Sequence, residues 1–225
     1  KRIGDNLYAN SLLAIDAKNG ELRWHYQVVK HDLWDRDNPS PPTLVKVQRD
    51  KELIDAVTLT TKSGHLYVFD RDSGESLHPI VAVETDLSST LPGEAPSKSQ
   101  QVSSIAFSRQ AFEITRRTPE ATAHVEDQIE GWDLRPWAPP KVGTVLITPW
   151  YDGGAEWGGS AFDPDSNRLI LNANDASGVL ELTEVPVGFS KYGSYMAHCG
   201  ACHGRQLEGT DQGVSLVGVA DRLTI

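Results

Sequence analysis

Cysteine and methionine are scarce in this sequence, which has two cysteines and a single methionine among its 225 residues. Both cysteines lie within residues 199–203, so no framework of disulfide bonds is available to hold the fold together. Long apolar runs are also missing, and no stretch reaches the length that a bilayer-spanning helix needs. We therefore expect any membrane association to come from parts outside this chain.

Basic residues are the minority charge: 21 lysines and arginines oppose 31 aspartates and glutamates, which gives a net charge of −10. This surplus of negative charge repels phosphate backbones and disfavours nucleic-acid binding. The 19 glycines, 13 prolines and six tryptophans are typical of a turn-rich, all-β protein. Because the chain opens at Lys1 in the middle of this pattern, we expect it to be an internal fragment of a longer protein.

One pattern recurs along the chain: an aspartate with a glycine four residues later, set between two strand-like runs. The two clear copies are Asp16 with Gly20 and Asp70 with Gly74. A third copy, within residues 161–174, has Asn167 at the glycine position, and asparagine tolerates left-handed backbone well. A strand–turn–strand unit that repeats after about 50 residues indicates the blades of a β-propeller.

The first copy also predicts a specific packing arrangement. Asn19 and Gly20 form a favourable hairpin turn, because both tolerate positive φ. Trp24 follows on the second strand, and we expect it to be buried between neighbouring antiparallel, four-stranded blades. Further strands are expected at residues 43–47, 55–61 and 143–150, a surface loop at 84–104, a strand or a short helix within 107–131, and a helix at 188–198.

Residues 31–37 hold three aspartates and a histidine around Trp34, ahead of a proline run. An aspartate in such a loop is often a turn former or a surface charge. A partly desolvated carboxylate, however, also suits a general base that takes a hydroxyl proton, and Asp35 is our candidate. We expect His31 and Asp32 to bond the loop backbone. Lys62 by itself is most simply a solvated lysine, but beside a reacting centre its ammonium stabilises developing negative charge.

The most specific motif is the run Cys-Gly-Ala-Cys-His at residues 199–203. This spacing attaches haem c through two thioether bonds, here from Cys199 and Cys202, and makes His203 the proximal iron ligand. A zinc site would need further ligands, and His198 is the one close candidate in the sequence. Met196 precedes the motif and is expected to pack within the helix.

Several segments resemble one known family. Residues 14–24 are similar to the tryptophan-docking repeat of quinoprotein dehydrogenases, the propeller enzymes that use pyrroloquinoline quinone (PQQ). The likeness is greatest to membrane-type glucose dehydrogenase and related sugar or polyol dehydrogenases, over roughly residues 1–180. The similar segments are residues 24–37 (catalytic aspartate), 61–75 (quinone-contacting lysine) and 153–175 (a later strand pair).

The resemblance implies an eight-bladed propeller with the quinone near its axis. It makes Asp35 the general base and a candidate Ca²⁺ ligand, and it places Lys62 against the quinone oxygens. Trp157 would line the site, and Asn172 or Asn174 would lie near the cofactor. Asp37 matches a pattern of lanthanide-using relatives that also occurs in sugar-type members without lanthanides, so its role stays open. The stacking tryptophan and main metal ligands belong to earlier blades, and we expect the fragment alone to be inactive.

The end of the chain resembles a different module. Residues 213–224 are similar to the stretch that follows the haem motif of cytochromes c, where a proline carbonyl accepts the histidine N–H. Val214 or a neighbour replaces that proline here, and its backbone carbonyl would still serve, with a less fixed orientation. We therefore predict a partial propeller at residues 1–183 and the start of an α-helical cytochrome c domain at 184–225. The sixth iron ligand is expected beyond Ile225.

Taken together, these features predict part of a periplasmic quinohaemoprotein dehydrogenase. A sugar, polyol or alcohol would be oxidised by PQQ, with Ca²⁺ or another hard cation as cofactor. Electrons would leave through haem c to a downstream cytochrome or quinone. The alternatives are a non-catalytic propeller scaffold and an electron-transfer protein that carries a structural propeller.

Overall fold

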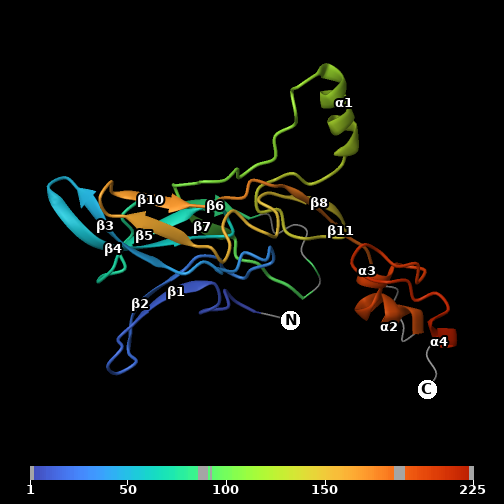
Figure 1. The fold of residues 1–225 in the computed structure, drawn as a ribbon, viewed down its shortest axis with the longest axis horizontal. Coiled ribbons are helices and arrows are strands. Elements are labelled where there is room, and N and C mark those ends of the chain that lie inside the picture. Colours follow the sequence, from blue (N-terminus) through green and yellow to red (C-terminus); the bar gives the residue numbers. More distant parts are fainter. Residues whose placement is uncertain (1–2, 86–90, 92, 185–190, 223–225) are drawn as a thin grey trace. The chain divides into compact units, whose positions relative to one another are not determined.

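The computed structural model describes residues 3–85, 91, 93–184 and 191–222 (Figure 1). Its contacts divide the chain into two compact units, Lys1–Leu182 and Thr183–Ile225. Each unit is described by itself. Within the described helices, none is long and apolar enough to cross a membrane.

The first unit is built from short antiparallel strands and one exposed helix. Its elements are β1 (Ser11–Ile15), β2 (Leu22–Gln27), β3 (Thr43–Arg49), β4 (Glu52–Thr60), β5 (Leu66–Asp70), β6 (Ile80–Glu84), β7 (Ser99–Ser103), α1 (Pro119–Gln128), β8 (Gly143–Ile147), β9 (Ser160–Asp163), β10 (Arg168–Leu171) and β11 (Gly178–Leu182). Strand β1 pairs with β2, β6 with β7, β8 with β11 and β9 with β10, while β3, β4 and β5 form one sheet.

The expected four-stranded blades are not complete in the part of the chain that the structure describes. The largest sheet there has three strands, in the order β3-β4-β5. At the next position outward, the backbone forms a single bridge between Phe69 and Ser76. The reason is local: the chain leaves the aspartate turn and runs beside β5 for too short a distance to make a regular ladder.

The repeated aspartate turns share one backbone geometry. The amide of Gly20 donates to the carbonyl of Asp16 at 2.8 Å, and that of Gly74 donates to Asp70 at 2.9 Å. The two glycines have φ of +76° and +75°, and Asn167 in the third copy has φ of +52°. The left-handed residue therefore recurs at the predicted position, as the repeat requires.

Trp24 joins the first copy of the repeat to the second. Its indole Nε1 donates to the carbonyl of Arg71 at 3.0 Å, and its ring lies 5.9 Å from that of Phe69, centroid to centroid. A β-carbon placed on Gly74 would lie 2.6 Å from the indole ring. The ring is half-buried instead of fully buried as expected, because its outer edge covers a surface turn.

This docking contact gives a matched pair of stability predictions. Gly20→Ala and Gly74→Ala place a side chain at the same φ, but nothing lies within 4 Å of Gly20. We expect Gly20→Ala to cost about 1 kcal/mol of unfolding free energy from backbone strain alone. Gly74→Ala adds an overpacking cost of about 1–3 kcal/mol against Trp24. Thermal unfolding of the full-length variants measures the difference, and equal losses would contradict the docking role.

One expected loop turned out differently. Residues 99–103, predicted as part of a surface loop, form β7, in which Gln100 is fully buried. The Gln100 amide accepts from the backbone N–H of Lys30 and donates to the carbonyl of Lys30, each at 2.9 Å. The polar sequence of β7 did not suggest a buried strand, because the amide of Gln100 is satisfied by hydrogen bonds to a residue far away in the chain.

Within 107–131, the short helix is the alternative that forms. It is α1, capped by Thr118, and residues 109–114 are irregular.

The main core of the first unit supports residues 31–37. Its buried members are Val28, Val29, Trp34, Val57, Leu59, Tyr67 and Phe69. Trp34 is 2% exposed, and its indole donates to the carbonyl of Ala138 at 2.9 Å. The chain therefore passes directly from the packed core to Asp35 and the two residues that follow it.

The second unit contains α2 (Lys191–His198), α3 (Gly200–His203) and α4 (Val219–Arg222). The helix expected at 188–198 is α2, and residues 188–190 lie outside the described part of the chain. Met196 packs as expected, since a β-carbon on Gly200 would lie 2.8 Å from its sulfur.

Candidate functional site

Lys62 lies between two carboxylates from the loop after Trp34. Its Nζ donates to Asp35 Oδ2 at 2.9 Å and to Asp37 Oδ1 at 2.7 Å. The lysine side chain is 7% exposed, whereas those of Asp35 and Asp37 are 62% and 50% exposed. The ammonium therefore sits at the end of a buried stem, and the carboxylates open toward solvent.

A third carboxylate faces the same ammonium, and we missed it in the sequence. Glu156 Oε1 lies 3.9 Å from Lys62 Nζ. Together, Asp35, Asp37, Lys62 and Glu156 are called the lysine–carboxylate cluster below. Its sequence signal is weak, because the glutamate merely precedes Trp157 in a glycine-rich run; the loop fold brings it to the cluster.

Burial and neighbouring charges shift the pKa values of Lys62 and Glu156. Burial disfavours the Lys62 ammonium, but its hydrogen bonds to Asp37 and Asp35 outweigh that effect, so the pKa of Lys62 is raised. Burial raises the pKa of Glu156; the positive charge of Lys62 opposes that change and the negative charge of Asp37 adds to it. Lys62 is therefore a cation throughout the neutral range.

Glycines 153 and 154 bring the Glu156 loop against Lys62. Gly153 has φ of +71°, and a β-carbon there would lie 2.6 Å from Lys62 Cα. The Gly154 amide donates to the Lys62 carbonyl at 2.7 Å. Ser40 Oγ then donates to the Glu156 carbonyl at 2.6 Å, which ties this loop to the one that follows Asp37. The close approach requires residues without side chains.

Asp35 has a left-handed backbone, with φ of +56°. The neighbouring Asp32 carboxylate holds this turn by accepting from the amides of Trp34 at 2.8 Å and Arg36 at 2.7 Å. His31 Nδ1 lies 2.7 Å from the carbonyl of Gly4. Asp32 bonds the loop backbone, as predicted, whereas His31 bonds a carbonyl in the N-terminal segment, outside this loop. A left-handed conformation costs free energy at a residue other than glycine, so the surrounding hydrogen bonds must maintain it at Asp35.

The other predicted residues lie at exposed positions. Trp157 is 78% exposed and follows Glu156 directly. The backbone amide of Asn174 donates to the carbonyl of Gly154 at 2.9 Å, so it lies beside the cluster's loop, and Asn172 follows β10. Both asparagine side chains are exposed. Among the described residues, no hydrogen bond connects either of these two side chains to the cluster.

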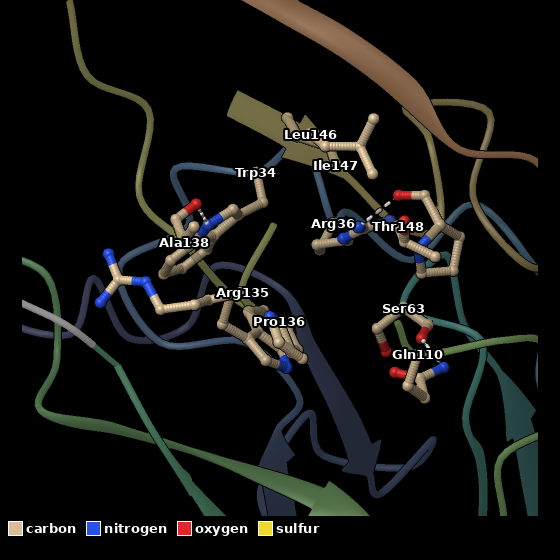
Figure 2. A pocket seen from close by; sticks show the side chains of 12 residues that line it. Trp34, Arg36, Ser63, Gln110, Arg135, Pro136, Ala138, Leu146, Ile147 and Thr148 are labelled. Carbon is tan, nitrogen blue, oxygen red and sulfur yellow. Dashed lines mark hydrogen bonds between the residues drawn. The ribbon is translucent and has the colours of Figure 1, made fainter. Parts of the chain in front are cut away.

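A small cavity lies behind the cluster and has a volume of about 20 Å³, enough for one water molecule. In Figure 2, Trp34 and Ala138 lie on one side of it, and Arg36, Ser63 and Thr148 on the other. Arg36 and Ser63 are the direct neighbours of Asp35 and Lys62 in sequence. The cavity therefore separates the core from the backbone that carries the cluster.

The turn that carries Lys62 also holds a buried histidine, and this gives a pH prediction. Burial lowers the pKa of His65 to about 4, whereas an unfolded histidine titrates near 6.5. Below pH 6.5 the unfolded chain binds a proton that the folded chain refuses until about pH 4. Stability is therefore lost as the pH falls through this window, by up to about 3 kcal/mol.

Thermal unfolding of the full-length protein between pH 7 and pH 4 measures this loss. His65→Gln should flatten the pH dependence, while the exposed His124→Gln should keep the wild-type slope. An unchanged slope in His65→Gln would show that other groups cause the loss.

The cluster fits part of a quinone and hard-cation site. Its buried ammonium is a donor for an anionic or carbonyl oxygen, and the exposed Asp35 carboxylate is a ligand type that Ca²⁺ prefers. In the described part of the chain, however, no group of three or more histidine, cysteine, aspartate or glutamate side chains is arranged to hold a metal ion. A cation there would need further ligands from elsewhere in the protein.

In the second unit, His203 is oriented by a carbonyl, as the sequence predicted. Its Nδ1 lies 2.7 Å from the carbonyl oxygen of Val214. A carbonyl accepts only, so Nδ1 carries the proton and Nε2 keeps its lone pair for a metal. Cys199 and Cys202 are free thiols, half-buried and exposed respectively. These three side chains therefore fit covalent haem attachment with His203 as an iron ligand.

Comparison with known proteins identifies the family of the chain. Residues 1–206 match the family model described as "PQQ: Glucose/ethanol/alcohol dehydrogenase, beta-propeller domain". Quinoprotein glucose dehydrogenase of Gluconobacter oxydans is 36% identical over 184 residues, covering 76% of this chain and 21% of that protein. Quinate/shikimate dehydrogenase (quinone) of Acinetobacter baylyi is 32% identical over 176 residues, covering 75% of this chain and 22% of that protein.

A solved structure shows the same fold. Quinohemoprotein alcohol dehydrogenase ADHIIG from Pseudomonas putida HK5 matches with a TM-score of 0.50 at 22% identity, over 81% of this chain and 22% of that one. The chain thus spans about a fifth of the length of these relatives. The chain belongs to the PQQ-dependent dehydrogenases of the glucose dehydrogenase type, and its residues 1–206 match their β-propeller domain.

Proposed function

We propose that this chain is part of a periplasmic quinohaemoprotein dehydrogenase that oxidises the CH–OH group of a sugar, polyol or alcohol. The observation that carries the proposal is the Lys62 ammonium held between Asp35 and Asp37, at 2.9 and 2.7 Å. Alcohol oxidation needs a base for the hydroxyl proton and positive charge where the acceptor becomes negative. The cluster contains both groups, side by side.

Asp35 is the proposed base. Its carboxylate is 62% exposed, so it is accessible to a substrate hydroxyl. The desolvation that favours a general base is not supplied by the described residues and would come from substrate, cofactor and the remaining blades. Asp35 would also bind Ca²⁺ or a similar hard cation. Asp37 already has a partner in Lys62, which gives it a role that needs no lanthanide.

Lys62 is the proposed contact to the quinone oxygens, with Trp157 and Asn172 or Asn174 nearby. PQQ, when bound, supplies the two-electron acceptor for the substrate's hydride. Because the side chain of Lys62 is buried, its ammonium is restricted to one position and its positive charge acts at that point. PQQ binding and substrate oxidation would also require residues from blades outside this chain.

Residues 184–225 are proposed to begin a cytochrome c domain. Cys199 and Cys202 would attach haem c, and His203 would ligate its iron through Nε2. Haem supplies one-electron transfer to a downstream cytochrome or quinone. What supports this assignment is the motif together with the bond from His203 to the Val214 carbonyl. Haem c attachment and the use of PQQ are both typical of exported proteins, which is why we propose a periplasmic location.

The test is reconstitution of the full-length protein with PQQ, Ca²⁺ and an artificial electron acceptor. Sugars, polyols, simple alcohols and a hydroxy acid such as quinate would be compared as substrates. We expect acceptor reduction that depends on both PQQ and substrate. A scaffold protein would bind no PQQ, and an electron-transfer protein would contain haem but show no PQQ-dependent oxidation. Either result would replace the proposal with that alternative.

A further inference from the structure

Arg36 stands between two cluster carboxylates in sequence but points away from them. Asp35 and Asp37 reach the Lys62 ammonium, whereas the Arg36 side chain turns inward and is 4% exposed. Figure 2 shows it at the wall of the small cavity, beside Thr148. Its guanidinium donates to the backbone carbonyls of Lys62 at 3.2 Å and Trp150 at 3.3 Å, and also to that of Pro149.

These three carbonyls belong to two separate segments that build the cluster. One is the carbonyl of Lys62 itself. The other two begin the loop that continues through Gly154 to Glu156, and Gly154 also donates to the Lys62 carbonyl at 2.7 Å. The planar guanidinium has five N–H donors in a fixed fork, so it can hold several carbonyls at once. An ammonium at this position would lack that geometry.

The backbone at Arg36 is fixed from its other side as well. Its amide donates to the Asp32 carboxylate at 2.7 Å, next to the left-handed Asp35. A left-handed aspartate persists when surrounding bonds enforce it. Arg36 therefore connects the turn that aims Asp35 to the backbone that carries Lys62.

We propose that Arg36 is a positioning residue that sets the geometry of the Lys62 ammonium relative to Asp35 and Asp37. Its guanidinium is hydrogen-bonded to backbone carbonyls, and not to the Lys62 ammonium or to the Asp35 and Asp37 carboxylates, so it acts through the backbone. Lys62 is held at both ends, by Arg36 at its carbonyl and by the two aspartates at its Nζ. The consequence for catalysis rests on the proposed function, but the effect on Lys62 does not.

The first test measures Lys62 in the full-length protein without quinone. An amine-acylating reagent is applied at one fixed pH, and the modification rate of Lys62 is read by peptide mass spectrometry. In the wild type, the 7% exposed, doubly bonded ammonium should react slowly. Arg36→Met should raise this rate about tenfold, the factor expected from losing one charge-assisted hydrogen bond. Arg36→Lys should give an intermediate rate, because it keeps the charge but not the fork.

Arg135→Met is the matched control. Arg135 lines the same cavity and is bonded to Asp133, a residue outside the cluster. The Arg135→Met variant should leave the modification rate of Lys62 at the wild-type value. If Arg36→Met does not fold, Arg36→Lys decides by the same measurement. A wild-type rate in the folded Arg36 variant would overturn the proposal, and so would an equal rise in Arg135→Met.

The second test is kinetic and uses the protein loaded with PQQ and Ca²⁺. Misplacing a catalytic group by about 1 Å can lower kcat about 10²-fold. We expect a loss of that order in Arg36→Met with little change in KM, and partial recovery in Arg36→Lys. A faster Lys62 reaction with unchanged kcat would overturn the positioning role. If the wild type itself shows no PQQ-dependent oxidation, the proposed function fails while the labelling result stands.

Discussion

Replacing Asp35 with asparagine in the full-length protein is expected to lower kcat by about 10²- to 10⁴-fold, the usual contribution of a positioned general base. The amide has the shape of the carboxylate and can still accept the 2.9 Å bond from Lys62, but it cannot take up a substrate proton. Quinone binding should therefore remain largely intact. Steady-state kinetics, with a separate titration of PQQ binding, measures both quantities.

Two further variants separate the base from general charge effects. Asp37→Asn removes a carboxylate that makes the equivalent bond to Lys62, at 2.7 Å, and we expect a much smaller loss of kcat. Asp72→Asn changes a side chain that is 90% exposed in the second aspartate turn and should have no effect. Near-wild-type turnover in Asp35→Asn would remove Asp35 from the mechanism. Equal losses in Asp35→Asn and Asp37→Asn would indicate that the pair acts through Lys62.

The second large effect concerns the haem motif. Cys199→Ala combined with Cys202→Ala should abolish covalent haem attachment, because both thioether bonds are lost. Haem reduction by substrate should disappear, while substrate-driven reduction of the quinone continues. Haem staining after denaturing electrophoresis measures attachment, and single-turnover spectroscopy follows the quinone and the haem separately.

The matched control is His198→Gln, which changes the exposed residue before the motif and should leave haem attachment intact. If the wild type instead retains zinc and loses it in His198→Gln, the motif is a zinc site. If the double cysteine variant still passes electrons to the natural acceptor at full rate, the haem is not part of the route. That outcome would leave the PQQ chemistry standing and assign the second unit another role.

The local features of this protein were predictable because they depend on neighbours in sequence. The left-handed residue of each aspartate turn needs glycine or asparagine wherever the turn stands, so Gly20, Gly74 and Asn167 identify it. The carbonyl that orients His203 was expected because residues 213–224 resemble the stretch that follows the haem motif of cytochromes c. The likeness of residues 24–37 to a segment of the quinoprotein dehydrogenases pointed to Asp35, and that of residues 61–75 pointed to Lys62.

Other features required the fold. β7 was hidden by its polar sequence, because the bonds of Gln100 go to Lys30, far away in the chain. Trp24 is half-buried because its partner is a surface turn in the next repeat. Such outcomes depend on which distant segments pack together. The residues adjacent in sequence therefore did not reveal how far these side chains are buried.

The sequence by itself thus determined the repeat and its turns, and it singled out the Cys-Gly-Ala-Cys-His motif, Lys62 and Asp35 as candidates. Only the tertiary structure decided that Glu156 joins them and that Arg36 turns inward to hold the Lys62 backbone. The physical reason is that every residue has a backbone carbonyl, so the sequence does not indicate which carbonyls accept a given hydrogen bond. Any backbone can accept them, so the partners of Arg36 exist only where the fold brings residues 62, 149 and 150 together.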